Sequence, residues 1–288
     1  MKSRQELIDD LLTLAFAEDV GDGDATTLST IPADELGRQK LIVKEEGILA
    51  GVEIARMVFE KFDPSLKMTV YINDGAHVKP GDVAFVVDGP VRSLLQTERV
   101  MLNIMQRMSG IATVTAKYQS RLEGLVTKVL DTRKTTPGMR LLEKDAVKIG
   151  GGENHRIGLF DMILIKDNHV DFAGGIHNAV EAARKWCAEN GKNLKIEVEV
   201  RNEDEIRQVL AENVDRIMLD NFTPERTRGA VEIIRADDKA NNRHTEIESS
   251  GGITIDTLRS YGETGVDFIS VGALTHSVKG LDMSFKAC

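Results

Sequence analysis

The second half of the chain repeats one pattern, in which a short apolar run ends in a polar residue and a helical stretch follows. The six runs are residues 127–131, 162–166, 195–199, 216–220, 246–249 and 268–271. Helical periodicity fills two of the intervals, at 179–188 and 203–211. This alternation predicts a parallel sheet built from βα repeats. Because polar residues collect where the strands end, we expect a barrel, either incomplete with six strands or with a seventh near 153–159.

The first part of the chain mixes short strands with helices. Ser3 and Glu6 form a capping-box pattern ahead of apolar residues at helical spacing, so residues 4–17 are predicted to be a helix. Further on, the pattern predicts strands at 39–45, 67–72 and 83–88 and a helix at 52–62. This mixture indicates an α+β layer.

A long helical pattern then runs from residue 94 to 122 and is interrupted at Ser109 and Gly110. We place a domain boundary at this interruption, because glycine weakens the interior of a helix. The predicted fold class is therefore α/β, with an N-terminal α/β (α+β) sandwich domain at 1–110 and a TIM-like, incomplete α/β barrel at 111–274. We expect the C-terminal tail, 275–288, to pack back on the first domain.

The charge of the chain restricts its partners. It has 37 Lys and Arg against 46 Asp and Glu, a net charge of −9. Residues 131–169 carry a local charge of +1, which leaves −10 for the remainder. An acidic protein lacks the broad phosphate neutralisation that non-specific nucleic-acid binding needs, whereas a locally cationic cleft would concentrate a small anion.

Other bulk features are typical of an ordinary cytoplasmic protein. No apolar run approaches the roughly 20 residues that span a bilayer, and the first residues lack the apolar core of a signal peptide. We therefore expect no membrane partner and cytoplasmic localisation. The two cysteines, Cys187 and Cys288, imply no disulfide framework, and we expect both to be incidental.

Five cationic or titratable side chains follow the first strands of the predicted barrel. They lie in three short segments: Arg133, Lys134, His155, Arg156 and Lys166. Arginine binds carboxylates and phosphates through two parallel hydrogen bonds, and lysine acts as a point charge. A single pair would be interpreted as solvated loop charges, but five at comparable positions favour a site for a multiply negative ligand.

Two acidic residues, Glu199 and Asp220, end the next two strands. A carboxylate there is expected to meet a sugar hydroxyl or a cation such as Mg2+, which takes one or two carboxylates plus substrate phosphates. The alternative is a structural ion pair with one of the lysines, and both remain open. We expect Glu197 and Glu199 to face opposite sides of their strand, without knowing which of them points inward.

Small residues follow the last two strands, namely Ser250, Gly251, Gly252 and Gly272. They would let backbone N–H groups approach a phosphate, as in many barrels, although a glycine pair alone is also typical of a plain turn. Other chemistries lack their patterns: there is no Walker loop, no histidine and cysteine spacing for zinc, and no cysteine near these motifs.

These segments together resemble a known family. The motifs are DTRKTTPGMR, KIGGGENHR, LIKDNHV, IEVEV, LDNF, ESSGGI and ISVGALTH, preceded by EDVGDGDATT, GILAGVEIA and ERVMLNIMQRMSGIAT. In this order they resemble quinolinate phosphoribosyltransferase, also called nicotinate-nucleotide pyrophosphorylase (carboxylating), over nearly the whole chain. The resemblance implies a pentosyltransferase of de novo NAD biosynthesis. It would convert quinolinate and phosphoribosyl pyrophosphate to nicotinate mononucleotide, CO2 and pyrophosphate, with Mg2+ and no organic cofactor.

The resemblance also implies roles for individual residues. Substrate-binding positions are Arg99, Thr132, Arg133, Lys134, His155, Arg156, Lys166, Glu199, Asp220, Ser250, Gly251, Gly252 and Gly272. Among these, Lys134, Lys166, Glu199 and Asp220 are expected to be catalytic. Glu199 and Asp220 would hold Mg2+, in part through substrate or water. Arg99 matches an arginine that the family contributes from the neighbouring subunit, so we expect a homodimer or larger homo-oligomer.

Three alternatives remain at this point. The first is a paralogous phosphoribosyltransferase for another acid, such as the relative associated with molybdenum transport. The second is an inert barrel that binds a metabolite or assists assembly, which the intact set of charged strand ends disfavours. The third is an unrelated barrel for sugar phosphates, a ligand that would not need the additional cation cluster of Arg133 and Arg156.

Overall fold

The computed structural model describes residues 2–288, and residue 1 of the predicted first domain lies outside them. The chain forms two compact units that alternate along the sequence. Unit 1 comprises residues up to Ala116, Lys134–Gly151 and Ala273–Cys288, and unit 2 comprises Lys117–Arg133 and Gly152–Gly272.

A four-stranded antiparallel sheet with strand order β12-β1-β5-β3 organises unit 1. Its strands are β1 (Leu36–Val43), β3 (Lys67–Val70), β5 (Val83–Pro90) and β12 (Met283–Ala287). The short strands β2 (Gly47–Ile48) and β4 (His77–Val78) pair with each other. The last strand of the sequence thus pairs with the first, and the strands predicted in the first part of the chain are confirmed.

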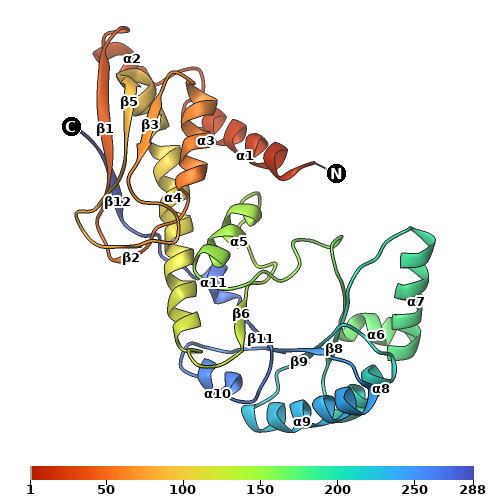
Figure 1. Ribbon diagram of the computed structural model, residues 1–288. Helices are drawn as coiled ribbons and strands as arrows, with labels where there is room; N and C mark the ends of the chain where they lie inside the picture. Colours follow the sequence, from red (N-terminus) through yellow and green to blue (C-terminus); the bar gives the residue numbers. More distant parts are fainter. Residues whose placement is uncertain (1) are drawn as a thin grey trace. The chain divides into compact units, whose positions relative to one another are not determined.

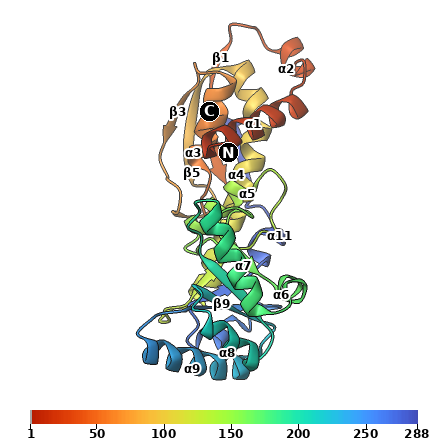
Figure 2. The same cartoon turned by 90° about the vertical axis from the view of Figure 1, so that its right-hand side faces the viewer.

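Unit 1 also contains helices, and α3 (Val52–Phe62) packs on the sheet through an aromatic side chain. The helices are α1 (Arg4–Asp19), α2 (Ala25–Thr30), α3, the unit 1 part of α4 (Val91–Ser120), α5 (Arg140–Ile149) and α11 (Ala273–His276). Phe59 of α3 lies 6.2 Å from Phe85 of β5 and 6.0 Å from Phe285 of β12, between ring centroids. Figures 1 and 2 show α1 and α3 on the same side of the sheet. The capping box predicted at Ser3 and Glu6 is present at the start of α1.

The predicted interruption at Ser109 and Gly110 is wrong, because α4 runs through both residues. Both are buried, and the Ser109 hydroxyl donates to the carbonyl of Ala50 at 3.0 Å and accepts from its N–H at 2.8 Å. A Cβ at Gly110 would lie 2.3 Å from the carbonyl oxygen of Lys279. The glycine therefore permits a close backbone approach and does not break the helix.

Unit 2 contains a six-stranded parallel sheet with strand order β6-β11-β10-β9-β8-β7. The strands are β6 (Lys128–Leu130), β7 (Ile163–Ile165), β8 (Ile196–Val200), β9 (Arg216–Asp220), β10 (Glu246–Ser250) and β11 (Phe268–Ser270). All six predicted strands are confirmed. Near the expected seventh, the structure has a single bridge between Leu130 and Glu153, so the barrel is incomplete.

Helices follow the strands of unit 2 along the sequence. They are α6 (Asp167–Ala173), α7 (Ile176–Glu189), α8 (Glu203–Ala211), α9 (Pro224–Asn241) and α10 (Leu258–Gly262). Figure 1 shows α8 and α9 along the outside of the sheet. The outer face of β8 is apolar at Val198 and Val200, both 0% exposed, as expected for strands covered by helices.

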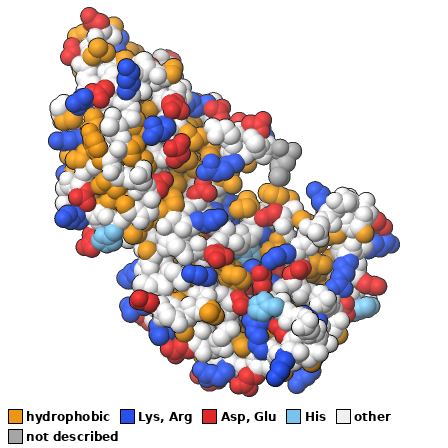
Figure 3. Space-filling view, viewed as in Figure 1, with side chains coloured by type: hydrophobic (Ala, Val, Ile, Leu, Met, Phe, Trp, Pro, Cys, Tyr) orange, Lys and Arg blue, Asp and Glu red, His pale blue; other side chains and the backbone are white. Residues whose placement is uncertain are grey.

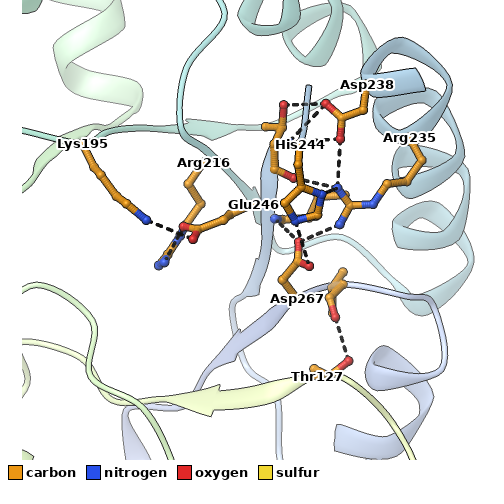
Figure 4. Close-up of polar contacts among 11 residues, drawn as sticks. Thr127, Lys195, Arg216, Arg235, Asp238, His244, Glu246 and Asp267 are labelled. Carbon is orange, nitrogen blue, oxygen red and sulfur yellow. Dashed lines mark hydrogen bonds and ion pairs between the residues drawn. The ribbon is translucent and has the colours of Figure 1, made fainter. Parts of the chain in front are cut away.

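Ion pairs tie the amino ends of the parallel strands together (Figure 4). Arg235 of α9 donates to Asp267, just before β11, at 2.6 Å. Glu246 at the start of β10 binds Lys195 at 3.0 Å and Arg216 at 2.8 Å. The Asp267 carboxylate also accepts the N–H of Ile247 at 2.7 Å. These contacts fix the end of the sheet opposite to the predicted site.

The surface of the described residues carries charges of both signs. Figure 3 shows Lys and Arg interspersed with Asp and Glu over the visible face, without a continuous region of one sign. Within residues 2–288, no helix combines the length and the hydropathy that crossing a membrane requires.

Candidate active site

The predicted site residues of unit 2 follow the carboxyl ends of neighbouring parallel strands, or the segment bridged to them. The segments with the cationic side chains come first along the chain: Thr132 and Arg133 follow β6, His155 and Arg156 follow the bridge at Glu153, and Lys166 follows β7. The acidic residues Glu199 and Asp220 lie near the ends of β8 and β9. Ser250 ends β10, Gly251 and Gly252 follow it, and Gly272 follows β11. In a parallel sheet these ends share one edge. Arg99 and Lys134 belong to unit 1, where both are exposed.

The first direct contact at this edge joins Lys166 to Glu199. The Lys166 ammonium donates to the Glu199 carboxylate at 3.1 Å, and Glu199 is 9% exposed while Lys166 is exposed. On the next strand, the Asp220 carboxylate accepts from the side-chain amide of Asn221 at 2.8 Å. The ion-pair alternative therefore holds for Glu199, and the two carboxylates still end adjacent strands.

The donor set fits a hard cation held in part by a ligand. Glu199 and Asp220 supply two carboxylates, and within residues 2–288 they belong to no group of three closely spaced metal-ligating side chains. Mg2+ commonly takes one or two carboxylates and completes its shell with water and substrate phosphates. This arrangement matches that mode of binding, not a cage made of protein ligands alone.

The cationic part of the site contains two neighbouring guanidinium groups. Arg156 is half-buried and donates to the carbonyl of Met162 at 3.2 Å. Burial lowers the pKa of Arg156, and the positive charge of Arg133 lowers it further. Two guanidiniums that disfavour each other in the free protein are compensated when an anion binds between or beside them.

His155 is held at both ring nitrogens and at its backbone. Its backbone N–H donates to the Asp131 carboxylate at 2.9 Å, and its Nδ1 accepts the backbone N–H of Arg156 at 2.7 Å. Its Nε2 lies 2.9 Å from a carboxylate oxygen of Glu197 and 3.5 Å from one of Glu248. Because Nδ1 is an acceptor, a neutral ring would carry its proton on Nε2, the nitrogen that lies beside the two carboxylates. The ring is therefore fixed relative to the backbone of Arg156.

A buried acidic pair lies beside His155 in the interior of the sheet. Glu197 and Glu248 are both 0% exposed, and Arg216 donates to Glu248 at 3.1 Å. Burial raises the pKa of each glutamate to about 7; the nearby Glu197 charge further raises that of Glu248, and Arg216 opposes both shifts. His155, Glu197 and Glu248 have the spacing of metal ligands, but the adjacent guanidinium of Arg216 already supplies a positive charge.

The expectation that Glu197 and Glu199 face opposite sides is wrong. Side chains alternate along a strand, so residues two positions apart share one face. In β8, Glu197 contacts His155 and Glu199 contacts Lys166, while Val198 between them is buried on the other face. Both acids thus point into the interior, where Glu199 reaches the edge and Glu197 lies deeper.

The turn after β10 requires glycine at one position. Gly251 has φ +102°, and a Cβ there would lie 2.2 Å from the side-chain oxygen of Asn221. The N–H of Asn221 donates to the carbonyl of Ser250 at 2.9 Å, so the ends of β9 and β10 are joined. Gly252 also has positive φ, at +61°, but open space around its Cβ position. The turn thus exposes backbone at the edge where the acidic residues end.

Sequence reasoning missed several charged residues that support these positions. Glu248 and Arg216 lie inside predicted strands, and Arg107 and Glu143 lie inside helices. The available signal was a charge at every second position of an apolar strand, as in residues 195–199 and 246–248. Such charges on a covered strand need partners, and they indicate a polar interior. No comparable signal marks Arg107 or Glu143, because charges on helices are usually solvated.

Comparisons with known proteins agree with the geometry. The family described as "Quinolinate phosphoribosyl transferase, C-terminal domain" matches residues 111–286, and the corresponding N-terminal domain matches residues 24–109. A chloroplastic nicotinate-nucleotide pyrophosphorylase [carboxylating] of Oryza sativa subsp. japonica is 46% identical over 96% of this chain and 76% of its own length. A probable enzyme of the same name from Bacillus subtilis is 42% identical over 95% of this chain and 91% of its own length.

A solved structure supports the same assignment. The nicotinate-nucleotide pyrophosphorylase of Francisella tularensis has a TM-score of 0.90 to this chain, with 41% identity, and the match covers 100% of this chain and 98% of that one. The mixed α/β fold, with an incomplete parallel barrel and an N-terminal sandwich, is therefore the fold of these enzymes. Since both domain families match in order over most of its length, this chain belongs to the quinolinate phosphoribosyltransferase family.

Proposed function

We propose that this protein transfers a phosphoribosyl group from phosphoribosyl pyrophosphate to quinolinate and decarboxylates the product. The products are nicotinate mononucleotide, CO2 and pyrophosphate, in NAD biosynthesis. The single observation that carries the proposal is the convergence of Arg133, Arg156 and Lys166 with two carboxylates at one edge of a family-typical barrel. A diacid and a polyphosphate both need such cations, and a ribose needs such carboxylates.

In this proposal the cations bind the two carboxylates of quinolinate. Arg133 and Arg156 form bidentate pairs, with His155 holding the backbone of Arg156 in place. Thr132, Lys134 and Lys166 complete the acid site, and Arg99 reaches it from a second copy of the chain. The half-burial of Arg156 strengthens its interaction with an anion because water screens it less.

Transfer then follows as an in-line displacement. The pyridine nitrogen of quinolinate attacks the ribosyl carbon, and the bond from that carbon to the pyrophosphate oxygen breaks. Glu199 and Asp220 hold the ribose hydroxyls. Ser250, Gly251 and Gly252 after β10, and Gly272 after β11, bind phosphate through backbone N–H groups. Glu199 and Asp220 would hold Mg2+, and when bound it would supply positive charge to offset the charge on the departing pyrophosphate.

Decarboxylation uses the substrate as its own electron sink. After coupling, the ring nitrogen is cationic and stabilises the electron pair that remains on the ring carbon when CO2 leaves. A proton from solvent then completes the product. Lys134 or Lys166 orients the carboxylate that is lost, and no organic cofactor is required. Lys134→Ala with normal turnover would remove Lys134 from this role.

Two further parts of the proposal concern assembly and location. The active form is a homodimer or larger homo-oligomer, which the exposure of Arg99 on α4 supports. We expect cytoplasmic localisation, as the composition predicts, although some plant relatives are named as chloroplastic or mitochondrial.

A product assay tests the function directly. Purified protein is incubated with phosphoribosyl pyrophosphate, Mg2+ and either quinolinate or nicotinate, and nicotinate mononucleotide and CO2 are quantified. Product from quinolinate alone is expected. Product from neither acid, with folded protein, would overturn the proposal and favour a paralogue with another acid. Omission of Mg2+ is expected to abolish turnover, because without the cation nothing offsets the repulsion between the two carboxylates and the negative leaving group.

A further inference from the structure

An ion pair in unit 1 between half-buried Arg107 and buried Glu143 joins α4 to α5. The Arg107 guanidinium donates to one oxygen of Glu143 from Nε at 3.0 Å and from Nη2 at 2.9 Å. Glu143 is 0% exposed. Withdrawing the Glu143 carboxylate from water is costly, so this pair is weak support for stability and calls for another explanation.

Both partners also bind backbone groups of distant segments. The second carboxylate oxygen of Glu143 accepts the N–H of Thr136 at 3.2 Å. Arg107 donates to the carbonyls of Thr275 in α11 and of Val278, the latter at 3.4 Å. The pair thus connects the segment after Arg133 to the segment that follows Gly272.

The segment 134–136 is held at both of its ends. The buried hydroxyl of Thr275 donates to the carbonyl of Lys134 at 2.9 Å, while Glu143 holds the N–H of Thr136. Between them, the Thr135 hydroxyl accepts from Arg140 at 3.0 Å. Every anchor lies within unit 1, and Lys134 itself is exposed. These contacts therefore fix the backbone that carries Lys134, and none of them involves the Lys134 ammonium.

We propose that Arg107, Glu143 and Thr275 are positioning residues for Lys134, acting through the backbone of residues 134–136. The role in turnover rests on the proposed function, in which Lys134 meets the substrate carboxylate. A displacement of a reacting group by about 1 Å can cost about 100-fold in rate. Loss of one anchor should therefore slow turnover without removing any group that contacts substrate.

The first test compares variants of the anchors. Glu143→Gln removes the charge that holds Arg107, Thr275→Val removes the hydroxyl, and Thr275→Ser keeps it. We expect kcat/KM for quinolinate to fall about 10- to 100-fold in Glu143→Gln and Thr275→Val, in line with misplacement of a catalytic group. Thr275→Ser should remain within about threefold of the unsubstituted protein, because its hydroxyl still reaches the carbonyl.

Unit 2 supplies a matched control. Asp267, like Glu143, accepts from one arginine and one backbone N–H, here Arg235 and Ile247 (Figure 4). Asp267→Asn should lower the melting temperature as Glu143→Gln does and leave kcat/KM at 25 °C unchanged. Equal losses of kcat/KM in the two variants would mean general destabilisation and would overturn the proposal.

A second readout is independent of catalysis. Hydrogen–deuterium exchange of peptides covering 132–139 should accelerate at least fivefold in Glu143→Gln and Thr275→Val, and remain unchanged in Asp267→Asn and Thr275→Ser. Unchanged exchange in the first two variants overturns the positioning role. If the unsubstituted protein has no activity with quinolinate, the proposed function fails, while the exchange data still decide whether these residues fix the segment.

Discussion

Arg156 shows at the residue scale how one side chain is prepared for an anion. It is half-buried near a second guanidinium, and its pKa is lowered by burial first and by Arg133 second. A cation in these surroundings binds an anionic ligand more strongly than an exposed one does, because the ligand replaces lost solvation. Selectivity between acids should therefore depend on this residue.

Arg156→Ala is expected to weaken quinolinate binding by about 30-fold or more, which corresponds to at least about 2 kcal/mol. Nicotinate, which has one carboxylate, should lose less. Isothermal titration with both acids measures the difference. Arg201→Ala is the control, since Arg201 pairs with Glu205 on the surface and should leave both affinities unchanged. Equal losses of affinity for the two acids would show that Arg156 does not bind the second carboxylate of quinolinate.

Glu248 should make stability depend on pH. Its folded-state pKa is raised from 4.5 to about 7 by burial and by Glu197, with His155 and Arg216 opposing the shift. The folded protein therefore keeps this proton up to a higher pH than the unfolded chain does. This contribution to stability is complete below about pH 4.5 and is lost as the pH rises through about 7.

Glu248→Gln cannot ionise, so its melting temperature should fall less than that of the unsubstituted protein between pH 5 and pH 8. We expect the two curves to differ in this fall by about 3–5 °C. Thermal unfolding followed by circular dichroism at several pH values measures it. Parallel curves would show that Glu248 is ionised throughout and that Arg216 fully compensates it.

Residue types at the edge of the barrel were accessible from the sequence, but their partners were not. The contact of Lys166 with Glu199 was one of two open alternatives, and the contact of His155 with Glu197 was not foreseen. Periodicity gives the face of a side chain, and applied correctly it places Glu197 and Glu199 together. It does not give the neighbour across the sheet, because strand order and register are set by tertiary packing.

At the scale of elements, the turn between β10 and the following segment offers a comparison of two adjacent glycines. Gly251→Ala would place a Cβ 2.2 Å from Asn221 at φ +102°, whereas Gly252→Ala meets open space at φ +61°. An alanine at φ near +60° costs about 1–2 kcal/mol, while the clash at Gly251 must displace the end of β9 as well.

We therefore expect Gly251→Ala to raise the KM for phosphoribosyl pyrophosphate at least tenfold and Gly252→Ala to raise it less than threefold, if the turn binds phosphate. Steady-state kinetics at saturating quinolinate measure both. The same KM in both variants, each folded, would contradict a special role for the turn at Gly251.

Elements of the barrel were well predicted because each strand is a short apolar run bounded by polar residues. All six were found from the sequence, and the missing closure is seen only in the structure, as one bridge at Glu153. The long helix was misjudged at Ser109 and Gly110. Small residues indicate a helix break when they are exposed to solvent. Here they are buried and contact distant backbone, and the local sequence does not reveal such contacts.

At the scale of the whole molecule, Arg99 is expected to act in a neighbouring copy. Arg99→Ala and Glu199→Ala should each be nearly inactive as homodimers. Mixed and re-equilibrated in equal amounts, they should regain about a quarter of the unsubstituted activity, because half of the dimers are mixed and each has one intact site.

Activity of the mixture measures whether the arginine is shared. No recovery, with subunit exchange shown by mass spectrometry, would place Arg99 in its own subunit's site or outside any site. Arg38→Ala serves as a control for loss of an exposed cation, since Arg38 pairs with Asp88 within unit 1.

The pairing of β12 with β1 has a consequence for biosynthesis. During synthesis β1 can pair with β5 early, but the other edge of β1 lacks its native neighbour until residues 283–287 have been made. Unpaired strand edges are where incomplete chains adhere to one another. We therefore expect the nascent chain to keep an open strand edge for as long as the barrel segments are being made, a state in which a chaperone would limit association between chains.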